Sequence, residues 1–151
     1  MSDTQLQSEA LAYIANSRFG LLTYIRPDGA PITRAMGSFA PDRENIVFST
    51  QSKSGKVSAI SSNERVSFFF EQDGQELAQW KNVLVIGNAI PAESDAEKAR
   101  QAAILAQRNP RFKEKIEKDG LNGTSIFTLK TEEIQYLDRS KGSGGTATIR
   151  V

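Results

Sequence analysis

The segment Ser49–Lys56, with the sequence STQSKSGK, gathers residues that are well suited to holding a phosphate group. It contains four hydroxyl side chains, two lysines and one glycine, and it lies between the apolar runs NIVF and VSAI. Hydroxyls and lysines donate hydrogen bonds to phosphate oxygens, as do the free backbone N–H groups at the start of a helix. The segment therefore predicts an anion site if a helix begins near Ser54.

The same residues allow two other interpretations. The nucleotide-binding P-loop pattern requires glycine where Thr50 stands and a hydroxyl where Val57 stands, so the segment does not match it. A plain helix start, capped by Ser54 and with both lysines in water, explains the same residues without a ligand, and the segment alone favours it. Arg34, on the preceding predicted strand, is placed to add a bidentate phosphate contact.

The absence of two residue types limits the chemistry that the chain can perform by itself. The sequence contains no histidine and no cysteine. It therefore lacks the usual general base near neutral pH, a thiolate nucleophile, and the ligands of most zinc, haem and iron–sulfur sites. No pair of acidic residues stands out, so we predict no metal site and assign no catalytic residue. Redox chemistry would have to come from a bound organic cofactor.

The charge balance and the apolar runs bear on the environment of the protein. The 151 residues include 19 basic and 18 acidic side chains, and this net charge of +1 gives no general attraction to nucleic acid or membranes. No apolar run approaches the roughly 20 residues that span a bilayer, and the first ten residues do not resemble a signal peptide. We expect a cytoplasmic protein that binds neither nucleic acid nor membranes.

Hydrophobic spacing and turn signals predict the elements that must position the phosphate-binding residues. Helices are expected over 4–16, 54–63, 94–109 and 110–120, and strands over 19–25, 32–40, 46–50, 65–71, 79–90, 125–129 and 133–137. Most connections between strands are too short for parallel crossovers, which favours an antiparallel barrel or curled sheet with helices at its rim. A single domain is expected over 1–140, followed by a Gly/Ser-rich, partly mobile tail over 141–151.

Four segments of the chain, in this order, resemble a known superfamily: GLLTYIRPDGAPITRAM, IVFSTQSKSGK, NERVSFFFE and WKNVLVIGNAI. They are similar to segments of the pyridoxamine 5'-phosphate oxidase-like split β-barrels, in particular the small general-stress-protein-like members. The resemblance covers about residues 10–90 well. It implies a mainly β fold with flanking helices, an antiparallel six-stranded split β-barrel. It also implies flavin mononucleotide (FMN) as the cofactor, bound at the interface of a homodimer.

The resemblance also implies which residues contact FMN. Arg34 matches the family's phosphate-binding arginine, and the lysine of the pattern formed by Ser54 and Lys56 also binds phosphate in the family. Asn82 matches a glutamine that reaches the flavin from the second subunit, and Trp80 lies beside it. The full implied set is Arg34, Ala35, Met36, Gly37, Ser49, Thr50, Ser54, Lys56, Trp80 and Asn82.

The chain departs from the family pattern at three points. Gly55 stands where relatives often have an arginine, and Phe39 stands where true pyridoxamine phosphate oxidases have a lysine that touches cofactor and substrate. The C-terminal segment also lacks the histidine that grips their substrate. Oxidation of pyridoxamine phosphate is therefore not expected.

Three functions remain open from the sequence. The first is an FMN-dependent oxidoreductase that acts on a small molecule with electrons from a nicotinamide cofactor. The second is a flavin-binding protein without turnover, such as an electron carrier or a stress-related binding protein. The third is a split barrel that binds no flavin or a different cofactor such as deazaflavin. The resemblance favours FMN over the third, but no acid or base residue separates the first two.

Overall fold

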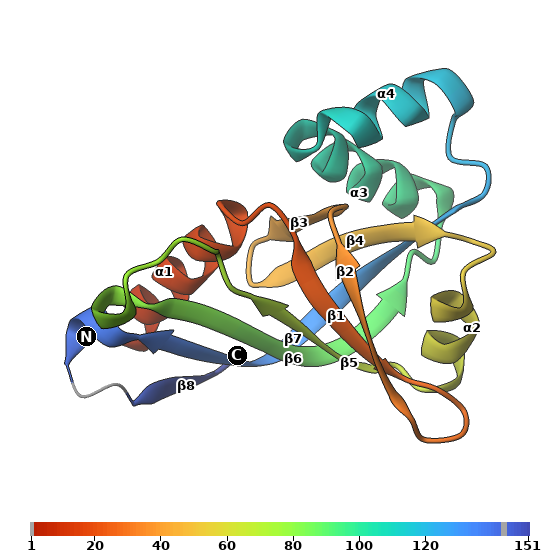
Figure 1. The fold of residues 1–151 in the computed structure, drawn as a ribbon. Helices are drawn as coiled ribbons and strands as arrows, with labels where there is room; N and C mark the ends of the chain where they lie inside the picture. Colours follow the sequence, from red (N-terminus) through yellow and green to blue (C-terminus); the bar gives the residue numbers. More distant parts are fainter. Residues whose placement is uncertain (1, 143–144) are drawn as a thin grey trace.

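The computed structural model describes residues 2–142 and 145–151, and this part of the chain folds into a curled sheet with helices around it (Figure 1). The strands are β1 (Gly20–Ile25), β2 (Pro31–Met36), β3 (Phe39–Asp42), β4 (Asn45–Gln51), β5 (Arg65–Phe70), β6 (Lys81–Pro91), β7 (Thr124–Asp138) and β8 (Thr146–Arg150). The helices are α1 (Asp3–Ala15), α2 (Gly55–Ser62), α3 (Asp95–Arg108) and α4 (Pro110–Asp119), with the 3₁₀ turns η1 (Leu77–Gln79) and η2 (Arg139–Lys141).

The described strands form one antiparallel sheet in the order β2-β1-β5-β6-β7-β4-β3, with β8 added to β7. The long strand β7 pairs with β4 along its first half and with β8 along its second half. This confirms the predicted mainly β, split-barrel class with flanking helices. The described sheet has eight strands rather than six, because the run 32–40 is broken at Gly37 and Ser38 into β2 and β3 and because β8 adds an edge.

The sequence predicted two strands over 125–129 and 133–137, but the structure has the single strand β7. The polar residues between these runs remain in the sheet because β6 and β7 change register there. Ile86 pairs with Glu133 and Gly87 with Thr131, so Glu132 is the extra residue of a β-bulge. The backbone N–H of Thr131, which the bulge leaves out of the hydrogen-bond ladder of the sheet, donates instead to Asn45 Oδ1 at 3.0 Å.

An aromatic cluster fills the interior of the sheet. Phe39, Phe48, Phe68 and Phe70 are fully buried, and the rings of Phe68 and Phe70 stack with centroids 4.8 Å apart. The alternation of side chains along β5 turns Phe69 to the opposite face, as the FFF run predicted. The inner face of β5 therefore belongs to the core.

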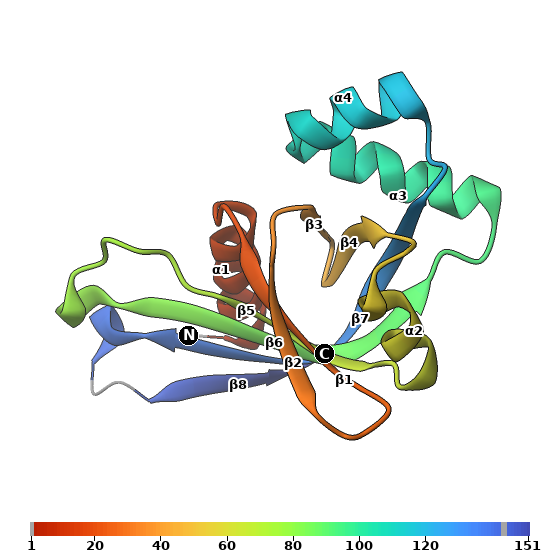
Figure 2. The same cartoon turned by 45° about the vertical axis from the view of Figure 1, so that its right-hand side comes forward.

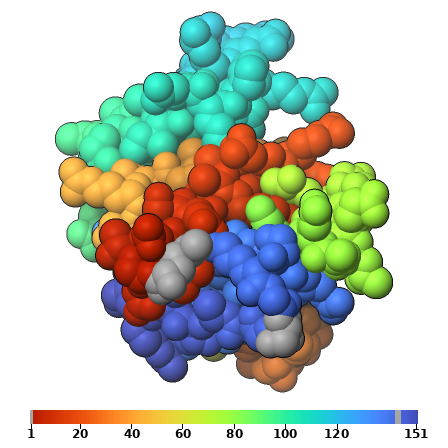
Figure 3. All heavy atoms as spheres, turned by 90° about the vertical axis from the view of Figure 1, so that its left-hand side faces the viewer, coloured from red at the N-terminus to blue at the C-terminus, as the bar shows by residue number. Residues whose placement is uncertain are grey.

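The helices cover different parts of the barrel (Figures 1 and 2). Helix α1 packs its buried Ala10 and Ile14 on the main core, whereas α3 and α4 pack on β3 and β4 through a second cluster that contains Leu105 and Phe112. Ser94 caps α3 by accepting a hydrogen bond from the backbone N–H of Glu97 at 3.1 Å. Figure 3 shows α3 and α4 stacked over the β3–β4 segment and α1.

The C-terminal segment differs from the tail that the sequence predicted. Residues Thr146–Arg150 form β8, and Ile149 is buried against the main core. Its Gly/Ser composition concealed this strand because the apolar alternation in TATIRV is short. Among the residues that the structure describes, no helix is long and apolar enough to cross a membrane.

Candidate functional site

A pocket of about 600 Å³ lies where β2, the end of β4, the start of α2 and the helix α4 meet. It brings together seven of the ten residues that the resemblance implied. These seven are Ala35, Met36, Gly37, Ser49, Thr50, Ser54 and Lys56. They come from segments up to about twenty residues apart in the chain, so the predicted grouping is a property of the folded structure.

Lys56 is the charged centre of this pocket. Its ammonium group is partly buried, and this burial, followed by the positive charge of Arg34, lowers the pKa of Lys56. Arg34 itself does not line the pocket, and its guanidinium group donates to the carbonyl oxygen of Thr33 at 3.1 Å. The charge of Arg34 is therefore close enough to affect the pKa of Lys56, but of these two predicted phosphate ligands only Lys56 lines the pocket.

The predicted start of a helix at Ser54 is present. Ser54 is the N-cap of α2, and its hydroxyl oxygen accepts a hydrogen bond from the backbone N–H of Lys56 at 3.2 Å. The first turn of α2 contains no acidic residue. The positive end of the helix dipole and the charge of Lys56 therefore favour an anion at the same place.

The hydroxyl groups of the pocket differ in how they are bonded. Ser49 is buried and its hydroxyl is hydrogen-bonded to that of Ser38. Thr124 is also buried, but its hydroxyl has no hydrogen-bond partner among the described residues. A buried polar atom without a partner costs free energy, so a ligand that bonded Thr124 would remove this cost. The donor set thus fits an anionic ligand.

Helix α4 contributes residues that the sequence analysis did not assign to the site. Asn109, Arg111, Phe112 and Lys115 line the pocket. Arg111 and Lys115 are four residues apart and so share one face of the helix. Their helical spacing was available in the sequence, but only the packing of α3 and α4 on β3 and β4 brings that face to the pocket.

Two other expected contacts are absent from this pocket. Trp80 and Asn82 do not line it, and both donate hydrogen bonds to Glu71 Oε2, at 2.8 Å and 3.0 Å. They lie at the start of β6, so a single chain does not bring them to Lys56. Phe39, which stands where true pyridoxamine phosphate oxidases have a lysine, belongs to the aromatic core, 5.1 Å from Phe70 between ring centroids.

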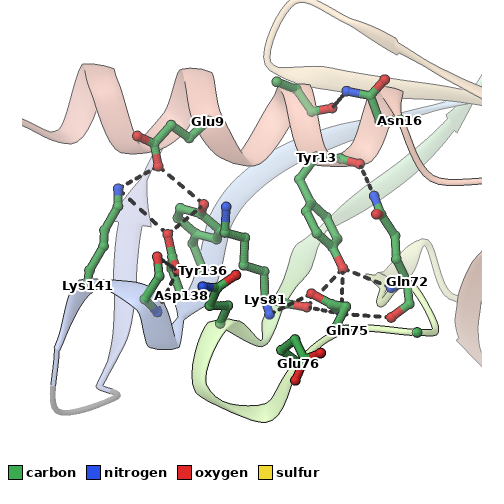
Figure 4. Close-up of a pocket in the computed structure, with 14 residues that line it drawn as sticks. Glu9, Tyr13, Asn16, Gln72, Gln75, Glu76, Lys81, Tyr136, Asp138 and Lys141 are labelled. Atoms are coloured by element: carbon green, nitrogen blue, oxygen red, sulfur yellow. Dashed lines mark hydrogen bonds and ion pairs between the residues drawn. The ribbon is translucent and has the colours of Figure 1, made fainter.

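A second cleft, of about 770 Å³, lies between α1 and the ends of β6 and β7 (Figure 4). The Tyr13 hydroxyl donates to the Lys81 carbonyl at 2.9 Å and accepts from the backbone N–H of Gln72 at 2.8 Å. Nearby, Lys141 Nζ lies 2.5 Å from Glu9 Oε2. These bonds hold α1 against the sheet, so the polar side chains of this cleft are explained by their role in the fold and do not require a ligand.

The comparisons with known proteins agree with this architecture. Residues 6–138 match the family model for pyridoxamine 5'-phosphate oxidase. No curated protein was found to match the sequence.

Several solved structures share the fold. A conserved hypothetical protein from Mycobacterium tuberculosis is 24% identical with a TM-score of 0.74, and 96% of this chain and 93% of that chain are covered. General stress protein 26 from Bacillus anthracis is 19% identical with a TM-score of 0.71, over 97% and 99% of the two chains. A heme binding protein from Mycobacterium smegmatis is 16% identical with a TM-score of 0.78, over 98% of this chain and 58% of that one.

Proposed function

Because the chain belongs to the pyridoxamine 5'-phosphate oxidase family, we propose that it is a flavoprotein that binds FMN in the pocket around Lys56 and acts as an oxidoreductase. The observation that carries this proposal is the partly buried ammonium group of Lys56, close to Arg34 and at the start of α2. Neither side chain forms an ion pair among the described residues, and two like charges held together are unfavourable unless an anion joins them. A phosphate group is the part of FMN that does so.

The rest of the pocket supports the same ligand. Met36 offers an apolar surface beside Ala35 and Gly37, against which a flat ring can pack. β2 is an edge strand, so its outer backbone groups are free to hydrogen-bond the polar edge of a flavin. Bound FMN would supply the electron chemistry, and the residues of this chain would bind and orient it.

The placement of Trp80 and Asn82 supports a shared site in a homodimer. Both lie outside the pocket of their own chain and close in sequence to Leu77, which is 69% exposed. We propose that this segment reaches the pocket of a second copy.

An apolar row on the outer face of the sheet supports the same dimer. Leu21 pairs with Ala35 and Phe69, and Phe69 pairs with Leu84, so the four side chains lie side by side across β2, β1, β5 and β6. A second copy of the chain would cover this surface.

Heme, the ligand named for one relative, has weaker support here. The chain has no histidine or cysteine to bind the iron. Of its three tyrosines, Tyr13 and Tyr136 are hydrogen-bonded in the second cleft and Tyr24 is buried in the core. FMN therefore fits the described residues better, with electron transfer without turnover, or deazaflavin, as the alternatives.

The proposal is tested by the flavin content of the protein and by two substitutions. We expect purified protein to carry the visible absorbance of oxidised flavin or to gain it with added FMN. The double variant Arg34→Ala/Lys56→Ala should bind FMN at least about tenfold more weakly, because the charged contact of Lys56 to phosphate is worth about 1.5–3 kcal/mol and the nearby charge of Arg34 adds to the attraction.

Lys113→Ala is the matched control, since Lys113 lies on α4 but lines none of the pockets described above. It should leave FMN affinity unchanged. Equal affinity in the double variant and the wild type would refute the assignment. NADH or NADPH consumption by the flavin-loaded protein would then separate an enzyme from a carrier.

A further inference from the structure

The pocket around Lys56 continues into a second hollow, of about 780 Å³, beside the connection between α1 and β1. The two hollows share Gly37, Ser38, Asn109 and Arg111 and so form one groove. Helix α4 lies above α3 and the β3–β4 segment (Figures 1 and 2), and its Arg111 lines both hollows. The combined groove is longer than the part that the FMN assignment uses.

The lining of this groove carries a single sign of charge. Its charged residues are Arg18, Lys56, Arg108, Arg111 and Lys115, and neither hollow is lined by an Asp or Glu. Within the described residues, Arg18, Arg111 and Lys115 form no ion pairs. Although the net charge of the chain is only +1, the positive charges in this groove create a local potential that attracts anions.

Two residues that line the groove each have a buried polar atom without a hydrogen-bond partner in the part of the chain that the structure describes. These atoms are the hydroxyl of Thr124, which lines the Lys56 pocket, and Nε of Arg108, which lines the second hollow. The rest of the Arg108 guanidinium donates to backbone carbonyl oxygens, including that of Phe39 at 3.0 Å. Each half of the groove is thus lined by one residue whose buried polar atom is left unsatisfied.

An aromatic side chain stands at the far end. Phe19 lines the second hollow and is 54% exposed, next to Arg18. Exposure of a large apolar ring beside cationic groups suits a base, whose flat face stacks on the ring while its phosphates meet the charges.

We propose that this groove binds a nicotinamide dinucleotide, the electron donor of the flavin site. Its phosphates contact Arg111 and Arg18, its adenine ring lies on Phe19, and its nicotinamide end points toward the pocket around Lys56. This inference rests on the proposed FMN site and names the class of its co-substrate.

The test is calorimetric titration of the FMN-loaded protein with NADP⁺ at low ionic strength. NADP⁺ cannot reduce the flavin, so the measurement reports binding alone. Arg18→Glu should weaken binding at least about tenfold, because it removes a charge-assisted contact and reverses its sign. Phe19→Ser should weaken it at least about fivefold through lost stacking.

Lys113→Glu is the control for Arg18→Glu. It also replaces a positive charge with a negative one, but Lys113 lies on α4 and lines neither hollow of the groove. It should change NADP⁺ affinity less than about twofold, as expected for a screened surface charge. Nicotinamide mononucleotide, which lacks the adenine end, should bind equally to the wild type and Phe19→Ser. FMN affinity should be the same in the Arg18 and Phe19 variants, since both residues lie outside the pocket around Lys56.

Failure of the inference and failure of the FMN proposal give different results. If the protein holds FMN but does not bind NADP⁺, or binds it equally in all variants, the groove is not a dinucleotide site and the flavin assignment stands. If FMN does not bind, the flavin assignment fails. Titration of the flavin-free protein with the same variants then supports or overturns the groove by the same differences.

Discussion

Lys56 holds its charge in surroundings that disfavour it. Burial, and then the nearby charge of Arg34, lower its pKa, whereas a bound phosphate dianion would raise it. The protonated form of Lys56 should therefore bind FMN more tightly than the neutral form. Elsewhere in the chain a cationic side chain does have an acidic partner: the guanidinium group of Arg100 lies 2.9 Å from the carboxylate of Asp42.

This arrangement gives a pH dependence with a defined sign. FMN affinity should fall as pH rises through the lowered pKa of Lys56, by at most about tenfold per pH unit, and binding should take up protons in that range. The phosphate of FMN is already a dianion there, since its second pKa is about 6. Calorimetry in buffers of different ionisation enthalpy measures the uptake. Proton uptake of the same size in Lys56→Met would show that another group is responsible.

At the scale of elements, the bulge between β6 and β7 depends on the missing side chain of Gly87. A Cβ at this position would lie 2.0 Å from the carbonyl oxygen of Lys130, a backbone atom that cannot move without shifting the strand. The bulge lets β7 pair with β4 at one end and β8 at the other. It thereby shapes the curl of the barrel.

Gly87→Ala should lower the free energy of unfolding by about 2–4 kcal/mol, as expected for a backbone clash in a buried strand. Urea denaturation of the ligand-free protein measures this change. Gly55→Ala is the matched control, because a Cβ there meets nothing within 4 Å and alanine favours the helix that begins at Gly55. Equal stability of the two variants would contradict the role of Gly87.

At the scale of the whole molecule, the outer face of β1, β5 and β6 is the surface on which the proposed dimer depends. Leu21 is 36% exposed, and its neighbours Phe69 and Leu84 are half-buried on the same side of the sheet. We expect the protein to sediment as a dimer at micromolar concentration. The double variant Leu21→Glu/Phe69→Glu should sediment as a monomer and lose FMN, because two carboxylates would face the second copy.

Lys118→Glu, which adds a carboxylate at the exposed end of α4, should remain a dimer. If the double variant were monomeric but bound FMN as well as the wild type, the site would be complete in one chain. Trp80 and Asn82 would then have no part in it.

Local patterns determined much of this protein. Two features follow from neighbouring residues and are present in the structure: the capped start of α2 at Ser54 and the alternation of Phe68, Phe69 and Phe70. The family model also matches the part of the chain that contains the four segments. The residues assigned to FMN from β2, β4 and α2 also come together, apart from the side chain of Arg34. Patterns of this kind are readable in a sequence because they depend on spacing within a single element.

Only the tertiary structure decided the rest. Arg111 and Lys115 reach the pocket because α4 packs against α3 and joins the β3–β4 cluster through Phe112, and the buried Thr124 hydroxyl has no hydrogen-bond partner among the described residues. Residues Thr146–Arg150 become a strand because β7 is long enough to offer them an edge, which their own composition does not reveal. Each of these features depends on contacts between residues distant in the chain, and such contacts leave no periodic signal in the sequence.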